Sequence, residues 1–120
     1  MIEDIIQDYL ETEIEVPVLM EIPSPMPDSF IVLEKTGSGE ENLIFSATIA
    51  VQSYAESLLG AATLNEQVKD VLLYGTTPPE ITRIKLNSDY NYTDPDLDRY
   101  RYQAVYDITH YYTKEESDNG

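Results

Sequence analysis

Apolar side chains recur at helical spacing at the start of the chain. In residues 1–11, acidic residues occupy one face and the opposite face carries Ile2, Ile5, Ile6, Tyr9 and Leu10. This pattern predicts a short amphipathic helix with one buried stripe. The β-branched run 14–22 that follows predicts a strand. Pro17 has no N–H to donate, so we expect this strand to lie at a sheet edge or to begin near the proline.

Residues 30–52 show the two-residue period that is typical of strands. Residues 30–35 predict a second strand and residues 43–52 predict a third. The apolar face of the third strand carries Leu43, Phe45, Ala47, Ile49 and Val51. Residues 36–41 contain two glycines and predict a flexible connection between the two strands. Two strands joined in this way form an antiparallel hairpin.

The spacing becomes helical again over residues 53–74. Ser53 and Glu56 match a Ser-x-x-Glu capping box, which predicts the start of a long helix at Ser53. Gly75 and the prolines that follow it predict the end of this helix.

The last third of the chain returns to strand spacing. Residues 81–86 predict a fourth strand, residues 87–97 a polar loop, and residues 99–112 a long fifth strand. One face of the fifth strand carries Tyr100, Tyr102, Tyr106 and Tyr112. Few basic residues lie near these tyrosines, so we expect them in the core and in subunit contacts rather than stacked on nucleotide bases.

The resulting order of elements is α-β-β-β-α-β-β. Three strands, a helix and two more strands do not build an all-parallel sheet. The sequence therefore predicts an α+β fold, with a mainly antiparallel sheet of about five strands and two helices packed on one face. The length fits one domain, over residues 1–113, followed by a polar and flexible tail over residues 114–120.

The charge balance narrows the classes of partner. The chain has 7 Lys plus Arg against 23 Asp plus Glu, a formal net charge of -16. This charge argues against binding to nucleic acid or to anionic membranes, because both require cations on the protein. Without cysteine there are no disulfides or thiol chemistry. No basic start with an apolar run and no apolar stretch of about 20 residues is present, so we expect no membrane association.

Three motifs are candidate sites of chemistry. His110 is the only histidine, and the nearby Asp107 falls on the opposite face of the predicted strand, so no catalytic pair forms locally. We interpret His110 as a rim residue of this tyrosine-rich strand. The run from Asp94 to Asp98 begins like a calcium loop but lacks the required later glycine and glutamate. Residues 37–39 lack the lysine and helix of a phosphate-binding loop. We therefore expect no catalytic residue, cofactor or metal, and not an enzyme.

The order of the motifs resembles a known family. These motifs are the amphipathic N-terminal helix, an apolar strand at 16–20, a proline-rich link ending in 29–37, the strand 47–55 leading into a long helix, and the segment 99–104 opening a terminal strand. Together, along residues 1–112, they are similar to the tail terminator (tail completion) proteins of long-tailed phages and prophages.

The resemblance implies a small structural subunit that closes into a hexameric ring. Such a ring caps the finished tail tube and ends its growth, meets the head connector or stopper protein, and lets DNA pass without specific binding. It would act in the neck of a virion assembled in the host cytoplasm. Electrostatics favour an acidic channel, because carboxylates repel moving phosphates.

Loops are the expected contact surfaces of such a subunit. The candidate interface residues are Thr36, Gly37, Ser38, Gly39, Glu40, Glu41, Asn87, Ser88, Asp89, Tyr90, Asn91, Tyr92, Asp94 and Asp96. Two other readings of the chain stay open. One is another neck or minor capsid protein, a connector or a stopper. The other is an acidic DNA mimic that inhibits a DNA-binding enzyme.

Overall fold

The computed structural model describes residues 1–111 of the chain. Its elements in order are α1 (Ile2–Glu13), β1 (Val18–Leu19), β2 (Phe30–Glu41), β3 (Ile44–Ala55), α2 (Leu58–Lys69), η1 (Asp70–Tyr74), β4 (Ile81–Asn91) and β5 (Tyr100–His110). The short π-helical η1 continues α2 directly. The predicted order of helices and strands is therefore confirmed. The predicted tail and Tyr112 lie outside the described residues.

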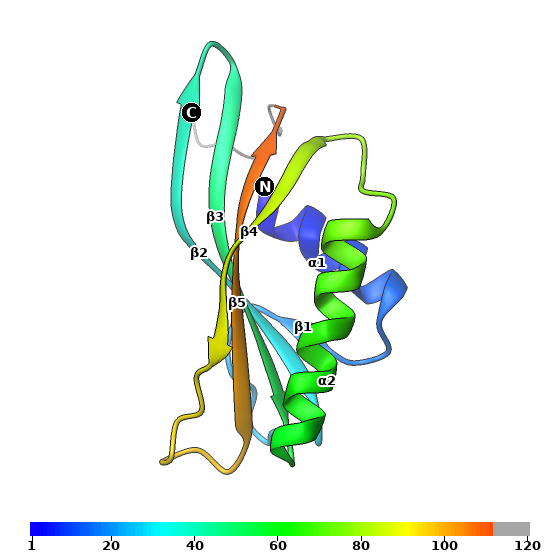
Figure 1. The fold of residues 1–120 in the computed structure, drawn as a ribbon, viewed down its shortest axis with the longest axis vertical. Helices are drawn as coiled ribbons and strands as arrows, with labels where there is room; N and C mark the ends of the chain where they lie inside the picture. Colours follow the sequence, from blue (N-terminus) through cyan, green and yellow to red (C-terminus); the bar gives the residue numbers. More distant parts are fainter. Residues whose placement is uncertain (112–120) are drawn as a thin grey trace.

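The strands form one sheet in the order β1-β2-β3-β5-β4. Only the β1–β2 pair is parallel, and the other three pairs are antiparallel. Both helices pack on the same face of this sheet, while the β2–β3 hairpin extends beyond them (Figure 1). The protein thus has the α+β fold that the sequence predicts. None of the helices in residues 1–111 is long and apolar enough to cross a membrane.

The main core lies between the sheet and the helices. The buried strand residues that face the helices are Ile31, Leu33, Ala47, Ile49, Val51, Ala104, Tyr106 and Ile108. The helices cover them with Ile2, Ile6, Leu10, Leu64, Val68 and Leu72. The predicted apolar stripe of the first helix and Ala47, Ile49 and Val51 of the predicted apolar face of the third strand therefore belong to one core, whereas Leu43 of that face is 77% exposed. Burying such a set of side chains is the main favourable contribution to folding.

The second helix begins later than its sequence suggests. Ser57, not Ser53, is the N-cap of α2, and its Oγ accepts a hydrogen bond from the N–H of Gly60 at 3.0 Å. Ser53 is buried within β3, opposite Ile31 of β2 and Tyr102 of β5. The prediction was wrong because neighbouring strands on both sides satisfy the backbone of β3 as far as its end.

The end of the second helix agrees with the prediction. Gly75 follows η1 directly, and its N–H donates to the carbonyl of Val71 at 3.1 Å. A Cβ at this position would stand 2.5 Å from both Val71 O and Tyr9 Oη. The Tyr9 hydroxyl also donates to Val71 O, at 3.0 Å. The glycine therefore allows the close contact between α1 and η1.

The first predicted strand is much shorter than residues 14–22. Only Val18 and Leu19 form β1, parallel to Ile31 and Val32. Pro17 supplies only a carbonyl, which accepts from the N–H of Ile31 at 2.9 Å. The sheet-edge position expected from this proline is correct, because β1 is the terminal strand on its side.

Replacement of Ser57 by alanine tests the cap. We expect Ser57→Ala to lower the free energy of unfolding by about 1 kcal/mol, because the N–H of Gly60 loses its acceptor. Ser57→Asp keeps a carboxylate acceptor and should stay near the native value. Urea denaturation followed by circular dichroism measures both variants. Equal stability of Ser57→Ala and the native chain would contradict this assignment of the cap.

Candidate functional surfaces

The first predicted loop is part of a strand. Residues 36–41 form the outer half of β2 and pair with β3 as far as Glu41 and Ile44. A two-residue turn joins the strands at Asn42 and Leu43, both with positive φ, 55° and 66°. Positive φ at both turn residues is the backbone conformation that two-residue hairpin turns favour. The expectation of a flexible connection was wrong, because a full ladder partner outweighs the low strand propensity of the two glycines.

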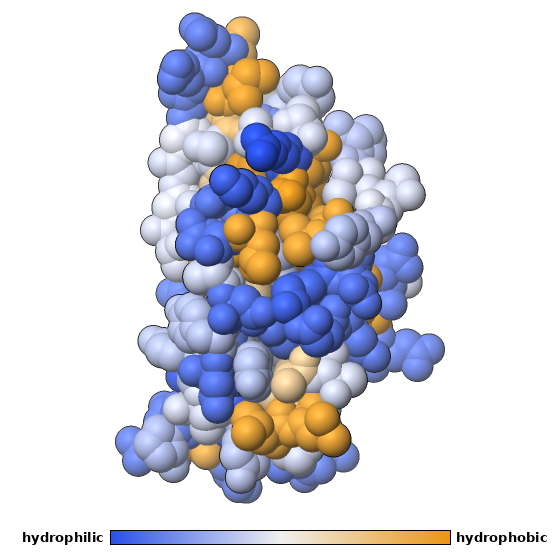
Figure 2. Space-filling model, in the orientation of Figure 1, coloured by the Kyte–Doolittle hydropathy of each residue, from blue (hydrophilic) through white to orange (hydrophobic). Residues whose placement is uncertain are grey.

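The tip of this hairpin presents apolar side chains. Leu43 and Ile44 are 77% and 42% exposed. The hairpin stands clear of the helical layer in Figure 1, and Figure 2 shows apolar surface at its end beside strongly hydrophilic residues. The Leu43 N–H donates to Glu40 Oε2 at 2.8 Å, which fixes the turn. The tip is thus an ordered apolar projection rather than a mobile loop.

His110 lies at the base of the hairpin. Its ring stacks on Phe45 with the centroids 5.7 Å apart, and its Nδ1 lies 2.7 Å from the carbonyl of Tyr111. The side chain is only 1% exposed, so the interpretation of His110 as a rim residue was wrong. The residue is buried because it lies on the helix-facing side of β5, next to Phe45 of β3.

The first part of the second predicted loop is also a strand. Asn87–Asn91 complete β4, and only residues 92–99 connect it to β5. A register shift between Leu86 and Ser88 changes the face of the sheet to which each following side chain points. As a result Asp89 faces α2, where Oδ1 accepts from Asn65 at 2.7 Å and Oδ2 pairs with Lys69 at 2.5 Å. This predicted interface residue therefore supports the packing of α2.

The remaining loop is shaped by its own side chains. Asn91 Oδ1 accepts from the N–H of Thr93 at 3.0 Å, and Asp94 Oδ1 accepts from the N–H of Asp96 at 2.9 Å. These contacts are Asx turns, which account for the spacing of the acidic residues without a bound cation. Residues 1–111 contain no group of three or more side chains placed to hold a metal ion.

Arg99 joins this loop to the proline-rich link. Its Nε donates to Pro27 O and its Nη2 donates to Met26 O, both at 3.0 Å. Met26 and Leu97 thereby cover a second small core on the sheet face away from the helices, formed by Phe30, Val32 and Tyr54. The loop and the link together close the end of the sheet opposite the hairpin tip.

A polar network crosses the sheet face that no helix covers. Gln52 Nε2 donates to Gln103 Oε1 at 2.8 Å, and Gln103 Nε2 donates to the hydroxyl of Tyr90 at 2.5 Å. Tyr54 donates to Gln52 Oε1 at 3.1 Å, and Arg101 donates to the Tyr54 hydroxyl at 3.0 Å. These links join β3, β5 and β4 and make the face rigid. The sequence signal for this network is the position of Gln52 on the polar face of its predicted strand.

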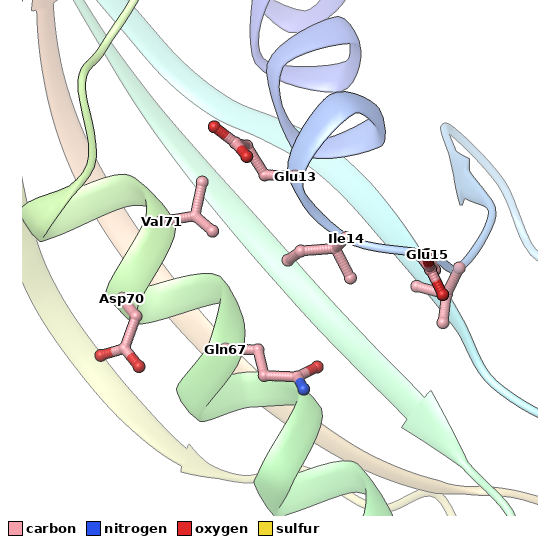
Figure 3. A pocket seen from close by; sticks show the side chains of 7 residues that line it. Glu13, Ile14, Glu15, Gln67, Asp70 and Val71 are labelled. Carbon is pink, nitrogen blue, oxygen red and sulfur yellow. The ribbon is translucent and has the colours of Figure 1, made fainter.

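An acidic cavity lies between the end of α1 and α2. It has a volume of about 510 Å³, and Glu13, Glu15 and Asp70 line it together with Gln67 and Val71 (Figure 3). The labelled carboxylates come from separate elements and spread around the opening rather than converging on one point. The cavity therefore presents negative surface without forming a defined ligand site.

Two titratable groups are perturbed by the packing around α2. Hydrogen bonds that Lys69 donates to Asp89, and then to Glu66, raise the pKa of Lys69 above its usual 10.5. Burial raises the pKa of Tyr106 well above its usual value, with a smaller effect from Asp89 and Glu66. At neutral pH Lys69 is thus a firmly held cation and Tyr106 a neutral core residue, and neither can act as a base.

The comparisons with known proteins give no family assignment. No family model matches the chain, and a search of curated proteins found no similar sequence. The functional argument therefore rests on the surfaces described above.

Asp89→Asn tests the contact between β4 and α2. We expect the pKa of Lys69 to fall toward its usual value, because the strongest partner of the ammonium loses its charge. Glu66→Gln, the matched control at an exposed partner, should lower this pKa less. NMR titration of the lysine side chains measures both variants. A larger shift for Glu66→Gln would contradict the assignment.

The ion pair between Asp89 and Lys69 also predicts how the stability of the protein depends on pH. The folded-state pKa of Lys69 is raised above 10.5, so its contribution is fully present below about pH 10.5 and is lost as the pH rises through the folded value. Native protein should lose stability over that alkaline range. The Asp89→Asn variant should lose less stability over this alkaline range, because it no longer has the ion pair. The ion pair contributes under about 1 kcal/mol to the free energy of unfolding.

Proposed function

We propose that the chain is a structural subunit of a phage or prophage tail. In this proposal several copies form a ring, a hexamer as in the family that the chain resembles, which caps the tail tube and ends its growth. Its partners are further copies of itself, the major tail tube protein and a connector or stopper protein of the head. The site of action is the neck of the virion, after assembly in the host cytoplasm.

The observation that carries this proposal is the β2–β3 hairpin. It projects past the helical layer, its turn is fixed by Glu40, and it ends in the exposed apolar pair Leu43 and Ile44. Exposed apolar side chains on a rigid projection are typical of protein–protein contacts. A subunit that must cap a tube needs such a projection along its axis.

Electrostatics add a second argument. With a net charge of -16, copies in a ring would surround the central channel with carboxylates. Repulsion between carboxylates and phosphates keeps DNA from adhering while it moves through the channel. The acidic cavity beside Glu13 and Asp70 adds to this negative surface on the helical side.

Deletion of the gene tests the proposal. We expect overlong or headless tails by electron microscopy, because tube growth would not be ended and heads would not attach. The native protein should copurify with tail tubes. Copurification with DNA-filled heads alone would favour a connector or stopper. Tight, salt-sensitive binding of the monomer to a basic DNA-binding protein would favour a DNA mimic, and normal virions would exclude a role in the tail.

Polar substitution of the hairpin tip tests its part in capping. The double variant Leu43→Ser and Ile44→Ser should fold, because both side chains are exposed, yet fail to bind tail tubes or restore normal tail length. Leu59→Ser, at an exposed leucine on α2, is the matched control and should restore normal tails. Tube binding by the tip variant at the native level would contradict the role of the hairpin.

A further inference from the structure

The sheet has an open edge on each side. β4 is the terminal strand on one side. On the other side, β1 pairs only with Ile31 and Val32, so the outer edge of β2 from Leu33 to Glu41 meets no other strand among residues 1–111. Unpaired strand edges carry free N–H and C=O groups and are templates for pairing with another chain.

The two edges run in opposite directions. β2 is antiparallel to β3, β3 is antiparallel to β5, and β5 is antiparallel to β4. β4 therefore runs opposite to β2. When copies are related by rotation about an axis along the strands, β4 of one copy meets β2 of the next in antiparallel orientation. Such a contact joins different patches of each subunit, which is the kind of interface that closes a ring.

The two edges carry opposite charges. Arg83 and Lys85 are exposed on β4 and make no ion pair within the described part of the chain. The free edge of β2 carries the exposed Glu34 and Glu41 on the same sheet face as Arg83 and Lys85, and the cation of this edge, Lys35, is paired with Glu3. In a chain with a net charge of -16, two unpaired cations on one edge strand are unusual. Charge complementarity thus selects the β2 edge of a second copy as the partner of β4.

The ladder registers place the two cations level with the glycine stretch of β2, between Glu34 and Glu41. Following paired residues across β5 and β3, Lys85 lies level with Gly37 and Arg83 lies level with Gly39. Copies in a closed ring share one height along the axis. Lys85 and Arg83 of one copy therefore face the glycine stretch of the next copy, with glutamates on both sides of that stretch.

Neither a positive φ nor crowding requires the glycine at position 37. Gly37 follows a register shift of β2, and a Cβ there would meet only ordinary contacts with Thr48 at 3.9 Å. Glycine weakens a strand and often marks a place where another backbone approaches closely. The space at Gly37 fits the backbone and the long cationic side chains of a neighbouring β4.

We propose that copies of this chain associate by edge-to-edge strand pairing, with β4 of one copy antiparallel to the outer half of β2 of the next. Arg83 and Lys85 form ion pairs across this contact with Glu34 and Glu41, which lie on the same face of the sheet as these cations. The inference rests on the proposed function only for the closed ring, since the strand contact requires nothing from the tail.

A charge exchange tests this contact. One variant combines Arg83→Glu with Lys85→Glu, and a second combines Glu34→Lys with Glu41→Lys. Each variant alone should lose the oligomer, because like charges then meet at every contact. An equal mixture should recover it, since the two variants alternate around a ring with opposite charges at each contact. Sedimentation velocity measures the oligomeric state.

The matched control reverses acidic residues elsewhere. Asp8→Lys with Glu56→Lys changes the same charge at exposed positions outside both edge strands and should leave the oligomer intact. Loss of the oligomer in this control, or failure of the mixture to recover it, would overturn the contact. So would unchanged association of the first variant, which would mean that the cations only shield the edge of β4.

Cross-linking gives an independent measurement in a chain without cysteine. A variant with both Gly37→Cys and Lys85→Cys should form a ladder of disulfide-linked oligomers on oxidation. Gly37→Cys with Asp8→Cys, the control, should give none. A chain that stays monomeric up to its solubility limit and forms no ladder overturns the proposal.

Tail length separates this contact from the proposed function. Strand cross-links in a protein whose deletion leaves virions normal would retain the contact and remove the role in the tail. Overlong tails on deletion, without cross-links between the two edges, would retain the role in the tail and overturn the contact.

Discussion

Burial of one face of the sheet under α1 and α2 is the interaction on which the other features depend. Ile49 of β3 and Tyr106 and Ile108 of β5 lie at its centre, and the helices supply the apolar residues above them. Because these two central strands are paired on both sides, they fix the position of β2 and β4. This packing therefore determines where the hairpin, the sheet face that no helix covers and the two sheet edges lie.

The two faces of the sheet are stabilised in different ways. The face away from the helices is held by hydrogen bonds among Gln52, Gln103 and Tyr90 instead of by a covering layer. At the end of this face away from the hairpin tip, Arg99 binds the proline-rich link and so covers the sheet. The surfaces proposed for partners are the tip of the hairpin and the two edges of the sheet. All of them are rigid, because each belongs to a long paired strand.

Charge has separate roles in different parts of the molecule. Asp89 and Lys69 form an ion pair that holds α2 against β4, and Lys35 pairs with Glu3 at 3.7 Å to hold α1 near β2. These cations are used within the subunit. In the proposed ring, Arg83 and Lys85 are left for use between subunits, and the remaining excess of carboxylates gives the negative surface that the proposed passage of DNA requires.

Local periodicity determined most of the fold. The stripe around Ile6, the alternation around Ile49 and the glycine at position 75 each depend on neighbours a few residues away, so the order of elements could be predicted from the sequence. The burial of His110 could not be predicted from local spacing, because it depends on Phe45, which is remote in sequence.

Tertiary structure decided where the strands end. Residues 36–41 and 87–91 contain glycine, asparagine and serine, which favour loops when considered alone. They are strands because β3 and β5 pair with one side of each segment. For the same reason β3 continues through Ser53 and the cap falls at Ser57. Hydrogen bonds between distant segments cannot be read from local pattern, and here they converted residues 36–41 and 87–91 of the predicted interface loops into edge strands.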